Sequence, residues 1–214
     1  MIQASNKQAC AVPDPGRSRR WVLAGAASLL PASWVWAGRQ LEEPLIDSVR
    51  SALSAAIASH APPVHEFDDP KEQAHYQHWL VKMSERLRSR MPDIQERQEF
   101  LQTVWYESRR AGLEVSTVLG LIQVESNFRK FAISRVGARG YMQVMPFWTR
   151  VIGDGDPSRL FHMQTNLRFG CVILRHYLDM EKGHYYYALG RYNGSRGQAQ
   201  YPTAVLGAKV RWAL

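Results

Sequence analysis

Residues 118–126 read Val-Leu-Gly-Leu-Ile-Gln-Val-Glu-Ser, an apolar run that ends in a single carboxylate. Val118, Ile122 and Glu125 are spaced i, i+4 and i+7, which places them on one face of a helix. Because that face is otherwise apolar, we expect Glu125 to point inward and to be partly desolvated. Desolvation raises the pKa of a glutamate from about 4.3 toward 6 or higher, so Glu125 is predicted to hold a proton at neutral pH and to deliver it to a leaving oxygen.

Further motifs follow this run in a fixed order. Besides Ser134, they are ESNF (125–128), GARGYMQVMP (137–146), TNLRFG (165–170) and ALGRYNGS (188–195). Together they resemble a lytic transglycosylase of the soluble type, with a goose-type-lysozyme-like catalytic domain, over roughly residues 110–208. The resemblance implies an all-α fold, with a lysozyme-like helical domain that contains a catalytic cleft. Tyr141 departs from the pattern, because such sequences usually carry a leucine there.

The resemblance also implies a substrate and a reaction. The substrate is peptidoglycan, cut at the β-1,4 bond between N-acetylmuramic acid and N-acetylglucosamine. Glu125 is the single acid and base, and the muramic C6 hydroxyl closes onto C1 to give a 1,6-anhydro end without water. The residues that the motif match assigns to substrate binding are Ser134, Gln143, Met145, Tyr192 and Asn193. Among them, Tyr192 corresponds to a tyrosine that orients the acid.

The other carboxylates leave two alternatives open. A glycosidase ordinarily uses two carboxylates, yet Asp154 and Asp156 lie in a Gly-Asp-Gly-Asp-Pro turn, and Asp179 and Glu181 are expected to face solvent at a helix end. One well-placed carboxylate favours a substrate that supplies its own nucleophile. A goose-type lysozyme-like hydrolase, with water as nucleophile and one of these aspartates as base, is the first alternative. A non-catalytic peptidoglycan-binding module of a secretion system is the second.

The first 37 residues are predicted to be a signal peptide. Arg19 and Arg20 precede an apolar stretch, and a small-x-small cleavage pattern ends at Ala37. The stretch resembles a twin-arginine signal, with the general secretory route as the alternative. We therefore predict export to the periplasm. The apolar run is interrupted by Pro31 and too short for a comfortable membrane span, so no transmembrane anchor is predicted.

Composition restricts the partners. The 214-residue chain is 45% hydrophobic with a net charge of +8, which is typical of a soluble domain with a polyanionic partner such as peptidoglycan. No DNA- or RNA-reading motif accompanies this charge, so we expect no nucleic acid partner. Cell-envelope or secretion-system proteins stay open as further partners.

Neither a metal nor a cofactor is predicted. Cys171, alone once Cys10 leaves with the signal, is expected to be a buried core residue.

Along the chain, residues 38–90 are predicted to form a linker and an N-terminal helical extension, and residues 91–214 the catalytic domain. No stretch from residue 71 onward alternates with a strand period, so the prediction is all-α. Ser116 is the expected N-cap of the helix that carries Glu125. The expected helices cover 71–90, 92–111, 117–126, 140–151, 166–180, 183–189 and 202–213, with a loop at 127–139.

Overall fold

A computed structural model describes residues 40, 45, 47–58 and 67–214; the predicted signal peptide and part of the predicted linker lie outside these residues. Every regular element in the described part is a helix, and the only β-pairings there are two isolated bridges. The predicted all-α class is therefore confirmed. The elements are α1 (Asp47–Ala58), α2 (Pro70–Leu87), α3 (Ile94–Arg110), α4 (Val115–Ser126), α5 (Phe147–Ile152), η1 (Pro157–Phe161), α6 (Met163–Met180), α7 (Tyr185–Asn193), α8 (Gln200–Lys209) and η2 (Val210–Trp212).

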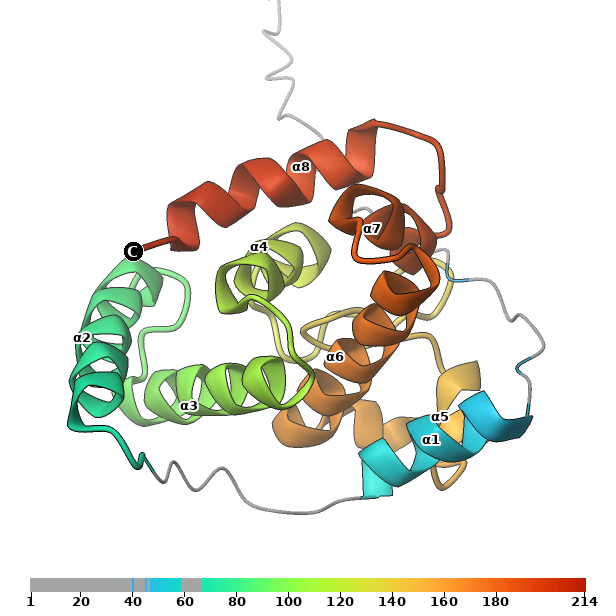
Figure 1. The fold of residues 1–214 in the computed structure, drawn as a ribbon, viewed down its shortest axis with the longest axis horizontal. Coiled ribbons are helices and arrows are strands. Elements are labelled where there is room, and N and C mark those ends of the chain that lie inside the picture. The colour runs from blue at the N-terminus through green and yellow to red at the C-terminus, as the bar shows by residue number, and fades with distance from the viewer. Residues whose placement is uncertain (1–39, 41–44, 46, 59–66) are drawn as a thin grey trace, which may run out of the picture. The chain divides into compact units, whose positions relative to one another are not determined.

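Helix α4 is packed between α3 on one side and α8 with η2 on the other (Figure 1). Its predicted inner face is fully buried, and Val118 and Ile122 have no exposed surface. Gly120 permits the close approach of α8, because a Cβ atom at this position would lie 2.8 Å from the backbone nitrogen of Lys209 and 2.9 Å from the carbonyl oxygen of Val205. The backbone of α8 thus lies directly against α4, which brings α8 side chains to the buried face that carries Glu125.

Helices α3 and α4 begin at other residues than predicted. Helix α3 begins at Ile94, because Asp93 caps it by accepting a hydrogen bond from the backbone of Glu96 at 2.7 Å. Helix α4 begins one residue before Ser116, with Glu114 at the N-cap. Ser116 lies in the first turn, where its hydroxyl donates to the Glu114 carboxylate at 2.9 Å. Cap statistics favour serine over glutamate, so the sequence pattern pointed to the wrong residue.

The segment 140–146 forms turns rather than the predicted start of a helix. Gly140 and Gln143 have φ angles of +75° and +48°, which a right-handed helix does not accept. The amide of Asn166, on α6, holds this conformation: it accepts from the backbone of Met142 at 2.8 Å and donates to the carbonyl of Arg139 at 2.9 Å. The helix itself, α5, begins only at Phe147. A contact from a distant element therefore overrides the local pattern.

The other helices agree with prediction, with shifted ends: α2, α6, α7 and α8 correspond to the helices expected at 71–90, 166–180, 183–189 and 202–213. The predicted loop over 127–139 is also confirmed. Cys171 is fully buried in α6, as expected. In the described part of the chain, no helix combines the length and the apolar character that crossing a membrane requires.

The two N-terminal helices pack against the same core. On α2, Trp79 lies 4.7 Å from Trp105 of α3 between ring centroids, and both are buried. Helix α1 contacts α5 and α6, and its Leu53 and Ile57 pack against the core. Part of the region predicted as linker is thus helical and packed on the core, while the boundary between residues 90 and 91 stays a prediction.

Candidate active site

Glu125 lies in the last turn of α4, and its side chain is only 1% exposed. The Tyr201 hydroxyl donates a hydrogen bond to its Oε1 atom at 2.5 Å. Its Oε2 atom is buried and has no hydrogen-bond partner among the described residues. Burial raises the pKa of Glu125 from 4.5 to about 8, and the bond from Tyr201 opposes this rise. The carboxyl group therefore keeps its proton at neutral pH. Oε2, which has no hydrogen-bond partner among the described residues, is the oxygen that is free to carry this proton.

The segment 140–146 is fastened to the helices around the acid. The Ser126 hydroxyl, next to Glu125, donates to the carbonyl of Tyr141 at 2.7 Å, and the Tyr192 hydroxyl donates to the carbonyl of Met142 at 2.8 Å. The amide nitrogen of Gln143 donates to the carbonyls of Ala132 and Gly140, whereas its Oε1 atom is buried without a partner in the described structure. Glu125, Gln143 and Tyr192 are all buried, and the segment that contains Gln143 is bound both by Tyr192 and by the direct neighbour of the acid in the chain. Ser126 acts as an anchor of this segment.

The hydroxyl that contacts the acid belongs to Tyr201, which the sequence did not single out. Tyr192 bonds to Met142 instead, although its side chain still interacts electrostatically with Glu125. Tyr201 lies in α8, outside every quoted motif, and reaches Glu125 only because Gly120 allows α8 to pack against α4. The only feature of the sequence that draws attention to Tyr201 is its position directly before Pro202, where a helix is predicted to begin.

The remaining predicted site residues are less directly connected to the acid. Ser134 is 8% exposed, and its hydroxyl accepts a hydrogen bond from Ala138 within the same turn. Met145 is half-buried and packs against the core. Asn193 ends α7 and is 3% exposed, with its side-chain nitrogen buried and unpartnered in the described structure.

The carboxylates considered as a second catalytic base interact with groups other than Glu125. Asp154 accepts from the backbone of Asp156 at 3.1 Å and pairs with Arg159, and these bonds lower its pKa. The pKa of Asp156 is lowered by Ser158. Residues 153–156 form exposed bends between α5 and η1. Neither aspartate is among the groups that shift the pKa of Glu125.

At the end of α6, one of the two predictions of solvent exposure is wrong. Asp179 is exposed and pairs with Arg175. Glu181, in contrast, is only 8% exposed, because Arg191 and Arg196 both bind its carboxylate. The hydrogen bond from Arg196 lowers the pKa of Glu181 to about 2. Glu181 is therefore the ionised partner of two arginines rather than a proton donor.

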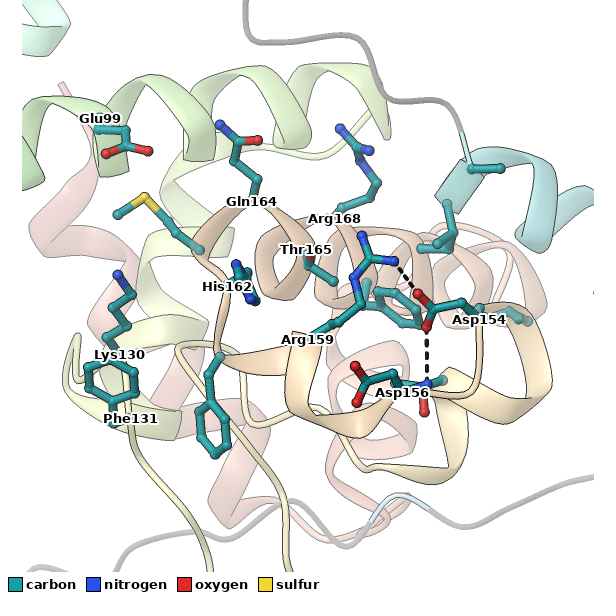
Figure 2. Close-up of a pocket in the computed structure, with 18 of the residues that line it drawn as sticks. Glu99, Lys130, Phe131, Asp154, Asp156, Arg159, His162, Gln164, Thr165 and Arg168 are labelled. Carbon is teal, nitrogen blue, oxygen red and sulfur yellow. Dashed lines mark hydrogen bonds and ion pairs between the residues drawn. The ribbon is translucent and has the colours of Figure 1, made fainter.

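A cavity of about 1230 Å³ lies elsewhere in the fold, between residues of α1, α3, η1 and α6. Figure 2 shows Asp154 and Arg159 at one end of it and Lys130 and Phe131 at the other. None of the six predicted site residues lines this cavity. Within the described part of the chain, no group of three or more His, Cys, Asp or Glu side chains is arranged to hold a metal ion.

The chain belongs to the transglycosylase SLT domain family, because the model of that family matches residues 103–209, from the middle of α3 to the end of α8. The family expected from the motifs is thus confirmed.

A membrane-bound lytic murein transglycosylase C from Mannheimia succiniciproducens is 45% identical over 84 residues, which are 36% of this chain and 24% of that protein. The protein of the same name from Actinobacillus pleuropneumoniae serotype 5b is 34% identical over 84 residues, 36% of this chain and 23% of that protein. The chain spans about a quarter of the length of these curated relatives. The solved structure of an inactive mutant of the lytic transglycosylase Slt from Pseudomonas aeruginosa aligns with a TM-score of 0.48 and 19% identity, over 83% of this chain and 38% of that chain.

The raised pKa of Glu125 has a consequence for stability. Between pH 4.5 and about 8 the folded state binds a proton that the unfolded chain has released, so each rise in pH favours unfolding. This destabilisation is absent below the pKa of the unfolded chain, 4.5, and complete above the pKa of the folded state, about 8. It amounts to roughly 3 kcal/mol between pH 5 and 8. Because glutamine does not titrate, urea unfolding should show Glu125→Gln gaining stability over the wild type by about that amount across this range. An equal difference at both pH values would contradict the raised pKa.

Proposed function

We propose that this protein is a peptidoglycan lytic transglycosylase of the cell envelope. It cleaves the β-1,4 bond between N-acetylmuramic acid and N-acetylglucosamine and leaves 1,6-anhydro-muramic ends. The observation that carries the proposal is the state of Glu125, a buried carboxyl whose pKa is raised to about 8, with one oxygen fixed by Tyr201 and the other unpartnered in the described structure. Membership of the transglycosylase SLT domain family supports the same reaction. The signal peptide and the periplasmic location stay predictions.

In the first step, Glu125 Oε2 gives its proton to the glycosidic oxygen, and the bond between that oxygen and C1 of the muramic acid breaks. The hydrogen bond from Tyr201 stabilises the carboxylate that this step leaves, because it favours the charged form. The carboxylate then takes the proton of the muramic C6 hydroxyl, whose oxygen bonds to C1. Glu125 returns to its protonated state, and the ring closure replaces the water that a hydrolase consumes.

Unsatisfied polar atoms in two of the predicted site residues support a sugar ligand. Buried polar groups in native proteins nearly always have hydrogen-bond partners, yet Gln143 Oε1 and Asn193 Nδ2 have none in the described structure. The first accepts a hydrogen bond and the second donates, which matches the hydroxyl and acetamido groups of the substrate. We assign both residues to substrate binding, together with Ser134, Met145 and Tyr192.

The proposed function is tested by incubating the full chain with purified, dye-labelled murein sacculi. We expect release of soluble muropeptides, because the buried acid is protonated at neutral pH and can cleave the glycan there. The release of dye is measured over time, with heat-denatured protein as the control. A folded protein that releases no more dye than this control would contradict the proposed function.

A further inference from the structure

Gln40 precedes the first helix in the sequence, but its side chain lies among the proposed site residues. It is 4% exposed. Its Oε1 atom accepts hydrogen bonds from the indole nitrogen of Trp148 at 2.8 Å and from the backbone nitrogen of Met145 at 3.4 Å. The side chain also interacts with the hydroxyl of Tyr192. A single carboxamide thus contacts two of the residues that we assign to substrate binding, and a tryptophan that no sequence motif indicated.

Two N–H groups that converge on one oxygen form a binding position for a carbonyl. The carboxamide of Gln40 is a planar amide, and the N-acetyl group on each sugar of a peptidoglycan strand is a planar amide with the same kind of carbonyl oxygen. Met145 belongs to the segment 140–146, which is bound at Tyr141 by Ser126, the neighbour of Glu125 in the chain. The two N–H groups that bind the carbonyl oxygen of Gln40 are therefore also suited to bind the acetamido carbonyl of the substrate.

We propose that the backbone N–H of Met145 and the indole N–H of Trp148 bind the acetamido carbonyl of a substrate sugar, and that Gln40 occupies this position in the free protein as an internal competitor. This inference rests on the proposed glycan-cleaving function. Cleavage of the predicted signal peptide after Ala37 makes Gln40 the third residue of the mature chain.

Removal of the competitor should strengthen binding of an acetylated glycan. We suggest calorimetric titration of the N-acetylglucosamine tetramer into Glu125→Gln, which prevents turnover, with and without Gln40→Ala. Loss of two competing hydrogen bonds is expected to tighten binding about 3- to 10-fold. Adding Trp148→Phe, which keeps an aromatic ring but removes the donor, should reverse most of that gain. The glucosamine tetramer, which lacks acetyl carbonyls, should show no gain.

Gln77→Ala serves as the matched control, because Gln77 is an exposed glutamine of α2. It should leave the affinity unchanged, and thermal unfolding verifies that each variant is folded. Equal affinity of the acetylated tetramer for the proteins with and without Gln40 would overturn the inference while leaving the proposed function intact. Absence of binding to every variant, together with no release of soluble material from sacculi, would contradict the proposed function and the inference together.

Discussion

Glu125→Gln is expected to slow the release of soluble muropeptides by about 100-fold or more, the size typical of the loss of a general acid and base. Glutamine has nearly the same shape, and its amide oxygen can still accept the hydrogen bond that Tyr201 donates to Glu125. It has no proton that it can give to a glycosidic oxygen at neutral pH. The rate of dye release from labelled sacculi, measured for both proteins at equal concentration, gives the comparison.

Asp179→Asn is the matched control for this variant. Asp179 is an exposed carboxylate near the end of α6 that pairs with Arg175, and it was considered as the base of a hydrolase. If Glu125 acts alone, this variant should keep its rate within a few-fold of the wild type. An activity of Glu125→Gln in that same few-fold range, in a protein with native circular dichroism, would remove Glu125 from the mechanism.

Tyr201→Phe is expected to lower turnover by about 10- to 100-fold, because it removes the group that fixes one oxygen of the acid and stabilises the carboxylate formed during reaction. The hydrogen bond from Tyr201 lowers the pKa of Glu125, so its loss raises that pKa further. The alkaline limb of the pH–rate profile should therefore move to higher pH. A purely structural role for Tyr201 would not move this limb, and rates measured from pH 5 to 10 test this point.

Tyr192→Phe is the natural comparison, since the Tyr192 hydroxyl donates to the carbonyl of Met142 and not to the acid. We expect this variant to lower turnover with a smaller shift of the alkaline limb. If instead Tyr192→Phe moves the limb and Tyr201→Phe does not, then Tyr192 orients the acid in the working enzyme, as its position in the motif implied.

The sequence predicted the elements that depend on local pattern. The apolar spacing around Val118 and Ile122 identified both the central helix and the buried position of Glu125, because a helix fixes which side chains share a face. The confirmed family follows from motifs that lie in the same stretch of chain. Burial alone then accounts for the direction of the pKa shift of Glu125.

Features that depend on contacts between distant elements could not be predicted in this way. Tyr201 is 76 residues from Glu125 in the chain, and only the close packing of α8 on α4 brings the two together. The turn conformation of residues 140–146 depends on Asn166 of α6. Likewise, Glu181 is buried because two arginines bind it, although its place at a helix end suggested exposure to solvent.

Mass spectrometry of muropeptides released by the wild-type protein in isotopically labelled water tests the proposed reaction most directly. If the C6 hydroxyl of muramic acid is the nucleophile, the products carry 1,6-anhydro ends, are lighter by one water than hydrolytic products and contain no label. This result is expected because an intramolecular hydroxyl held near C1 outcompetes water, so Glu125 needs no second carboxylate. Products with mostly reducing muramic ends that contain labelled oxygen would contradict the proposal and make the protein a hydrolase.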